Sequence, residues 1–146
     1  MIPRFRAWYT PFKGKTFGQE MKYGQAGRLI THAEMAPDKY VLMQSTGMKD
    51  KNGVEIFEGD VALITHKSTD YADTYWHSYV EVFRAKNGAY RIRGEHIYET
   101  ELYSNRKQLT VAGNIYNSPE LLKRDRFMTT TENPELLEEQ DESKRT

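Results

Sequence analysis

The sequence contains no cysteine among its 146 residues. Disulfide frameworks, thiolate nucleophiles, iron–sulfur clusters and thiolate-ligated zinc are therefore excluded. Long apolar runs are also absent: no stretch approaches the roughly 20 apolar residues of a membrane-spanning helix, and the first residues lack the apolar core of a signal peptide. We therefore expect a cytoplasmic protein that has no membrane partner.

An excess of one charge is lacking as well, because 21 basic residues balance 21 acidic ones. Residues 1–122 carry a formal charge of +2 and residues 123–146 carry −2. Neither part has the clear positive charge that phosphate-dominated binding of nucleic acid favours. The composition divides the chain at the same point, since the last 24 residues hold few apolar side chains. We predict one domain over residues 1–122 and a charged, flexible or helical tail over 123–146.

Signatures of catalysis are missing too. The chain has no dinucleotide-binding or phosphate-binding glycine loop and no G-x-S-x-G motif, and none of its four histidines has a metal-binding spacing. The nearest approach to a metal constellation is formed by His66, Asp70, Asp73 and His77, for which solvated loop residues and cross-strand polar pairs are the simpler interpretation. Asp60 is expected to cap a turn rather than to react. We predict a non-enzyme with no cofactor and no metal.

What the chain does contain is strand-forming sequence. Aromatic residues make up 12% and include ten tyrosines, which suit a pleated, half-buried surface. The segment 98–103 could be a short helix or a strand. Strands are predicted at 3–9, 28–31, 39–45, 54–57, 61–66, 75–83, 89–93 and 109–116.

Three turns organise these predicted strands. Lys51-Asn52-Gly53 and Lys86-Asn87-Gly88 are typical of hairpins, because Asn and Gly adopt positive φ readily. Glu58-Gly59-Asp60 leads into the apolar run 61–64, which favours a buried strand. The order of these signals predicts a small β-barrel.

Two similar segments near the C-terminus have the pattern of helix starts. Residues 117–122 and 133–137 each place proline after an N-capping position and glutamate in the first turn. We expect the first to close the barrel. The second has one apolar pair followed by acidic residues, so an acidic interaction tail and a disordered terminus both remain open.

Residues 46–53 and 55–61, which read TGMKDKNG and EIFEGDV, resemble the signature of the YopX-like proteins of phages and prophages. Residues 2–8 are similar to the opening strand of that family, and residues 111–122 to its closing segment. The resemblance implies a small SH3-like barrel, an origin in a phage or prophage, and action in the cytoplasm of a bacterial host. It implies no established activity and transfers no catalytic residue.

Two functions follow from the residues themselves. The hairpin edges favour a non-enzymatic module that binds a protein or assembles with itself, as a homo-oligomer. The alternative is a barrel that binds nucleic acid through the aromatic and basic hairpin 75–93. The candidate surface for either partner consists of Arg4, Arg6, Trp76, Tyr79, Arg84, Lys86, Tyr90, Arg91 and Arg93.

Overall fold

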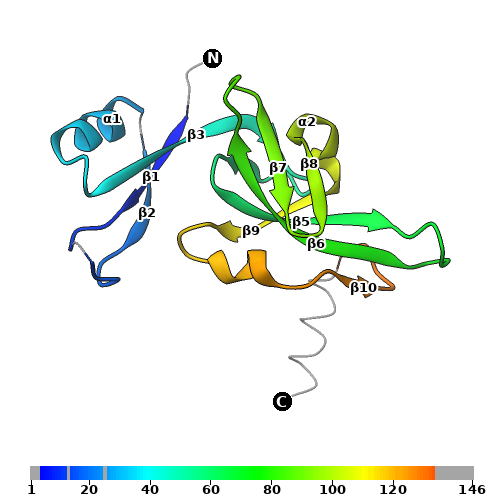
Figure 1. Cartoon of the computed structure of the whole chain (residues 1–146). Helices are drawn as coiled ribbons and strands as arrows, with labels where there is room; N and C mark the ends of the chain where they lie inside the picture. Colours follow the sequence, from blue (N-terminus) through cyan, green and yellow to red (C-terminus); the bar gives the residue numbers. More distant parts are fainter. Residues whose placement is uncertain (1–3, 13, 25, 134–146) are drawn as a thin grey trace.

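The computed structural model describes residues 4–12, 14–24 and 26–133 (Figure 1). Two sheets form the body, and helix α1 lies against the smaller, N-terminal one. In chain order the elements are β1 (Phe5–Tyr9), β2 (Glu20–Gly24), α1 (Ala26–Met35), β3 (Tyr40–Lys49), β4 (Glu55–Phe57), β5 (Asp60–Lys67), β6 (Tyr75–Arg84), β7 (Tyr90–Gly94), β8 (Ile97–Glu101), α2 (Leu102–Asn105), the 3₁₀ turn η1 (Arg106–Gln108), β9 (Leu109–Asn114), the 3₁₀ turn η2 (Pro119–Lys123) and β10 (Phe127–Thr129).

The N-terminal sheet has the strand order β2-β1-β3-β4. Strand β3 is ten residues long and serves both halves of the molecule: its first part pairs with β1, and its last part pairs with β4 beside the second sheet (Figure 1). Individual backbone hydrogen bonds join the two halves, such as the one from the N–H of Gly59 to the carbonyl of Val82 and the one from Lys51 to Leu109.

The second sheet has the order β8-β7-β6-β5-β9 and curls into a half-barrel, which confirms the predicted mainly β fold (Figure 1). Strand β5 is buried from Asp60 to Thr65 because the core covers one of its faces and the chain after β9 covers the other. Each fully buried aliphatic side chain contributes about 1.5–3 kcal/mol relative to exposure. The core consists of Ile56, Ala62, Ile64, Val80, Val82, Ile92, Leu102 and Leu109.

The three predicted turns are confirmed. Gly53 and Gly88 have φ of +80° and +88°, the left-handed conformation that their hairpins need. Gly59 has φ of +85°, and a Cβ atom at this position would lie 2.9 Å from the sulfur of Met43. Glycine is therefore required at this turn for its conformation and for its lack of a side chain.

The strand predicted at 28–31 is wrong, because these residues belong to helix α1. Leu29 and Ala33 are four residues apart and share one helical face, and Leu29 is buried. Pro37 follows soon after the helix ends at Met35, as is usual for a residue that cannot continue a helix. The helical spacing outweighed the short apolar pair that suggested a strand.

The predicted C-terminal boundaries also need correction. Residues 98–103 end one strand and begin helix α2, so both alternatives for that segment hold in part. The strand predicted to reach residue 116 stops at Asn114, whose side-chain oxygen accepts the N–H groups of Tyr116 and Asn117 and turns the chain. The helix start predicted at 117–122 is instead the 3₁₀ turn η2 over Pro119–Lys123, which packs on β6 and β5.

The first part of the predicted tail belongs to the folded body. Strand β10 pairs with β6, and the ring of Phe127 stacks on that of His77 at 5.0 Å between centroids. Composition suggested a tail because residues 123–133 have few apolar side chains, but hydrogen bonds from His77 and Lys51 also join this segment to the body. Apart from Asn133, the second predicted helix start and the acidic residues after it lie outside the described residues.

Candidate binding surfaces

Arg6, a predicted surface residue, is buried between the two sheets. Its guanidinium lies 2.7 Å from a carboxylate oxygen of Asp60, and the two side chains are 4% and 1% exposed. The same guanidinium donates a hydrogen bond to the carbonyl of Glu58 at 3.2 Å and lies over the ring of Phe57. Arg6 therefore joins β1 to the turn before β5 and is not available to a partner.

Asp60 has the structural role expected from its turn. Its second carboxylate oxygen accepts the backbone N–H of Phe57 at 2.8 Å. Burial raises the pKa of Asp60 above its ordinary value, while the charge of Arg6 and these hydrogen bonds act in the opposite direction. The pair is thus a desolvated ion pair whose partners depend on each other.

The predicted surface of hairpin 75–93 carries cations that already have carboxylate partners. Arg91 pairs with Glu99 at 2.8 Å, and Arg93 pairs with Glu81 at 3.3 Å while stacking on the ring of Phe83. The outer face of β6, β7 and β8 is therefore a ladder of alternating charges. Such a face offers little net attraction to a phosphate backbone.

The remaining predicted surface residues are dispersed. Trp76 and Tyr79 lie beneath Arg126 and Arg124, which come from the segment leading into β10. Tyr90 packs against the core, and burial raises its pKa. Arg84 and Lys86 are exposed beside the hairpin turn. Arg4 is exposed and pairs with Glu55 at 3.3 Å.

The weak metal constellation does not assemble. His66 is paired with Trp76, and His77 is paired with Thr65, so the two histidines lie on opposite faces of the β5–β6 ladder. Among the described residues no group of three potential ligands gathers.

His77 is fully buried in a chain of hydroxyl groups. Its Nδ1 lies 2.8 Å from Thr65 Oγ1, and its Nε2 lies 2.6 Å from Thr129 Oγ1. The hydroxyl of Thr129 donates to the carbonyl of Thr131, so it accepts from His77. A neutral imidazole that satisfies both contacts carries its proton on Nε2 and accepts the hydroxyl proton of Thr65 at Nδ1.

A polar pocket of about 190 Å³ opens on the other side of Thr65. Its distinguishing feature is three lysines, which come from the turn after β3, the end of β5 and the 3₁₀ turn before β9. We call it the lysine pocket; it is lined by Lys51, Thr65, Lys67, Tyr75, Lys107, Gln108 and Glu132.

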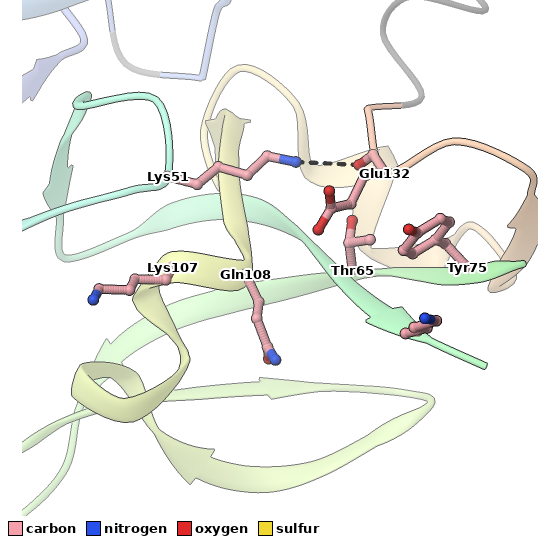
Figure 2. Close-up of a pocket in the computed structure, with 7 residues that line it drawn as sticks. Lys51, Thr65, Tyr75, Lys107, Gln108 and Glu132 are labelled. Carbon is pink, nitrogen blue, oxygen red and sulfur yellow. Dashed lines mark hydrogen bonds between the residues drawn. The ribbon is translucent and has the colours of Figure 1, made fainter. Parts of the chain in front are cut away.

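Figure 2 shows how these side chains lie. Lys51 reaches across the pocket, where its ammonium donates to the carbonyl of Glu132 at 3.2 Å and to the side-chain oxygen of Asn133 at 3.0 Å. Lys107 points away from Glu132. The ammonium groups of Lys51 and Lys107 are therefore not directed at one point.

Strand β5 has an open edge at this pocket. Its residues up to Ile64 pair with β9 on one side and with β6 on the other. Thr65, His66 and Lys67 pair with β6, and within the described chain the pairing with β9 has ended because η1 precedes Leu109. Successive residues of a strand direct their backbone groups to opposite sides, and the N–H of Ser68 bonds to the carbonyl of Thr74 just before β6. The backbone groups of Thr65 and Lys67 therefore face away from β6, at an edge with no neighbouring strand among the described residues.

Sequence reasoning missed this pocket. Lys51, Lys67 and Lys107 are separated by 16 and 40 positions and belong to no common motif. Only the antiparallel register of β5 with β9 brings the second and third together. Lys51 is the one pocket lysine in a segment that the sequence singles out, because it stands in the hairpin turn of the segment that resembles the YopX signature.

The fold and the pocket together describe a mainly β protein, built on a half-barrel sheet with a cationic pocket at the open edge of β5. The chain belongs to the YopX family, because the family model described as YopX protein matches residues 4–123. A solved structure, protein EF1440 from Enterococcus faecalis, is 29% identical, with 84% of this chain and 99% of that chain covered and a TM-score of 0.47. No curated protein matches. Within the described residues, none of the helices has the length and apolar character needed to cross a bilayer.

Proposed function

We propose that this YopX-family protein is a non-enzymatic binding module that recognises a protein partner, a second copy of the chain included, at the lysine pocket. The observation that carries the proposal is the charge of the pocket lining, which includes three lysines and one carboxylate, that of Glu132. On the predicted hairpin surface, by contrast, Arg91 and Arg93 are each paired with a carboxylate. Uncompensated charge at the rim of a cavity attracts and orients an acidic partner.

The family resemblance supports a setting for this activity. We propose that the curled sheet works as an SH3-like barrel does, by presenting a partner site at its surface, in a phage or prophage protein within the bacterial host cytoplasm.

Nucleic-acid binding is the second candidate, and one feature favours it. Tyr75 stands beside Lys67 in the lysine pocket, and a ring next to a cation is the arrangement on which bases stack. The compensated hairpin and the formal charge of zero oppose it.

Affinity capture from cells that carry the source phage or prophage tests the proposal. Half of each preparation is treated with nuclease, and the mass of the eluted complex is measured by light scattering. We expect a defined protein partner, or a closed homo-oligomer, in both halves. Material lost after nuclease treatment would contradict the proposal and select nucleic acid instead.

A variant separates the two candidate surfaces in the same experiment. Arg91→Gln with Arg93→Gln alters the hairpin and leaves the lysine pocket intact. Capture should survive this change if the pocket is the site, and it should fail if the 75–93 hairpin is the site.

A further inference from the structure

We infer that the partner binds as an extended acidic peptide that adds to the open edge of β5 at Thr65–Lys67, with its carboxylates meeting the three lysines of the pocket. The inference rests on the proposed function and names the chemistry of the partner. It requires two features to coincide: an unpaired strand edge and cations along it.

The edge is the first feature. Thr65, His66 and Lys67 continue β5 beyond Ile64, the residue at which β9 begins to pair. Their partners in β6, Tyr75 to His77, hold them in extended geometry. A strand that is already extended and paired on one side loses little conformational entropy when a peptide pairs with its other side.

The cations are the second feature. Side chains on one face of an extended peptide repeat at about 6.6 Å, since each residue advances about 3.3 Å. Lysines that point in different directions around a pocket suit several carboxylates along such a peptide better than they suit one small anion. Lys51 and Lys107 have this divergent arrangement (Figure 2). The pocket wall also contains hydrogen-bonding groups from Thr65, Tyr75 and Gln108.

The charge complementarity selects the acidic peptide over other occupants. An apolar segment would leave the ammonium groups of the rim without partners, and a basic one would be repelled. The first residue of the chain after the described part is Pro134, which has no backbone N–H to donate to a strand edge. We infer a segment of another chain as the occupant, and the test below distinguishes it from the acidic residues that follow Pro134 in this chain.

The test uses fluorescein-labelled octaglutamate and the full-length chain, with binding followed by fluorescence anisotropy. We expect saturable binding that weakens as salt is added, because exposed charge pairs are screened. The variant Lys67→Glu with Lys107→Glu should bind at least about tenfold more weakly. Its matched control is Lys39→Glu with Lys86→Glu, which makes the same change in net charge on exposed lysines outside the pocket. The control should bind octaglutamate more tightly than the pocket variant and nearly as tightly as the original chain.

A second probe separates strand addition from simple attraction of charge. Octaglutamate methylated at every backbone nitrogen keeps its carboxylates and loses the donors that a strand edge requires. It should bind at least about tenfold more weakly than the unmodified peptide, and the unmodified peptide alone should slow hydrogen exchange of the amides of Thr65 and Lys67.

Three results would overturn the inference. Equal binding of both probes would show attraction by charge without strand addition, and the proposed function would stand. Binding that appears only when Glu138, Glu139, Asp141 and Glu142 are changed to their amides would assign the pocket to this chain's own carboxylates. Absence of octaglutamate binding, together with nuclease-resistant capture of a protein, would show that the partner is not acidic; failure of capture as well would remove the proposed function itself.

Discussion

The buried arginine Arg6 and the exposed lysines of the pocket differ in burial and in pairing. Arg6 is 3% exposed, fixed by Asp60 and the carbonyl of Glu58, and stacked on Phe57. Lys67 and Lys107 are exposed at the rim of a pocket that contains one carboxylate. A desolvated cation stabilises the fold only with its partner, whereas a solvated one adds little to folding and remains free to bind. Burial and pairing, rather than the type of residue, therefore separate structural charges from functional ones.

The largest effect expected is at the buried pair. Asp60→Ala should lower the free energy of unfolding by about 3–5 kcal/mol, because Arg6 is left buried without its counter-ion. Urea denaturation measures the change. The double variant Arg6→Met with Asp60→Leu should lose less than Asp60→Ala, since it buries no charge. A loss below about 1 kcal/mol for Asp60→Ala would place Arg6 among the solvated cations.

The pH dependence of Arg6→Met sharpens the same contrast. Burial raises the pKa of Asp60, and removal of Arg6 leaves that effect less opposed. The folded state then binds a proton more readily than the unfolded state, so stability falls as pH rises between the ordinary carboxyl pKa of about 4 and the raised value. Arg6→Met should therefore be more destabilised at neutral than at acid pH. The double variant Arg6→Met with Asp60→Asn should lack this difference.

A smaller effect is expected where the C-terminal segment joins the sheet. His77→Phe keeps a ring against Phe127 and removes the hydrogen bonds to Thr65 and Thr129. The cost should be about 1–3 kcal/mol. Trypsin should also cleave after Arg124 and Arg126 sooner than in the original chain, because β10 is held less firmly. Unchanged cleavage would show that the backbone pairing of β10 holds the segment without His77.

The smallest change in stability is expected in the lysine pocket. Lys67→Glu with Lys107→Glu should alter the free energy of unfolding by no more than about 0.5 kcal/mol per residue, because both side chains are exposed. Thermal and urea unfolding measure it. A loss as large as that of Asp60→Ala would make these lysines structural and would remove the contrast between the two groups.

The sequence was sufficient for most of the half-barrel and insufficient for the pocket. Turns with Asn-Gly or Glu-Gly-Asp are local signals, so the β3–β4 and β6–β7 hairpins and the start of β5 followed from them. Helix α1 was missed because glycines around it hid the helical spacing of Leu29 and Ala33. Strand β10 was missed because its partner strand is far away in the sequence: Phe127 pairs with His77, which lies 50 positions earlier.

The predicted surface shows the same limit. Arg6 and Arg93 belong to alternating strands, and alternation indicates which residues share a face but not which carboxylate stands opposite. Strand register alone placed Glu99 beside Arg91 and Glu81 beside Arg93. The fold places no carboxylate in an ion pair with Lys67 or Lys107 among the described residues. No local sequence pattern distinguishes these lysines from the paired arginines.

The most direct test of the account is partner capture by three forms of the full-length protein, each with its unfolding free energy measured in parallel. The forms are the original chain, Lys67→Glu with Lys107→Glu, and the control Lys39→Glu with Lys86→Glu. The account predicts that the pocket variant loses the nuclease-resistant partner while all three remain equally stable. A pocket variant that keeps its partner at unchanged stability would contradict the assignment of the lysine pocket as the binding site.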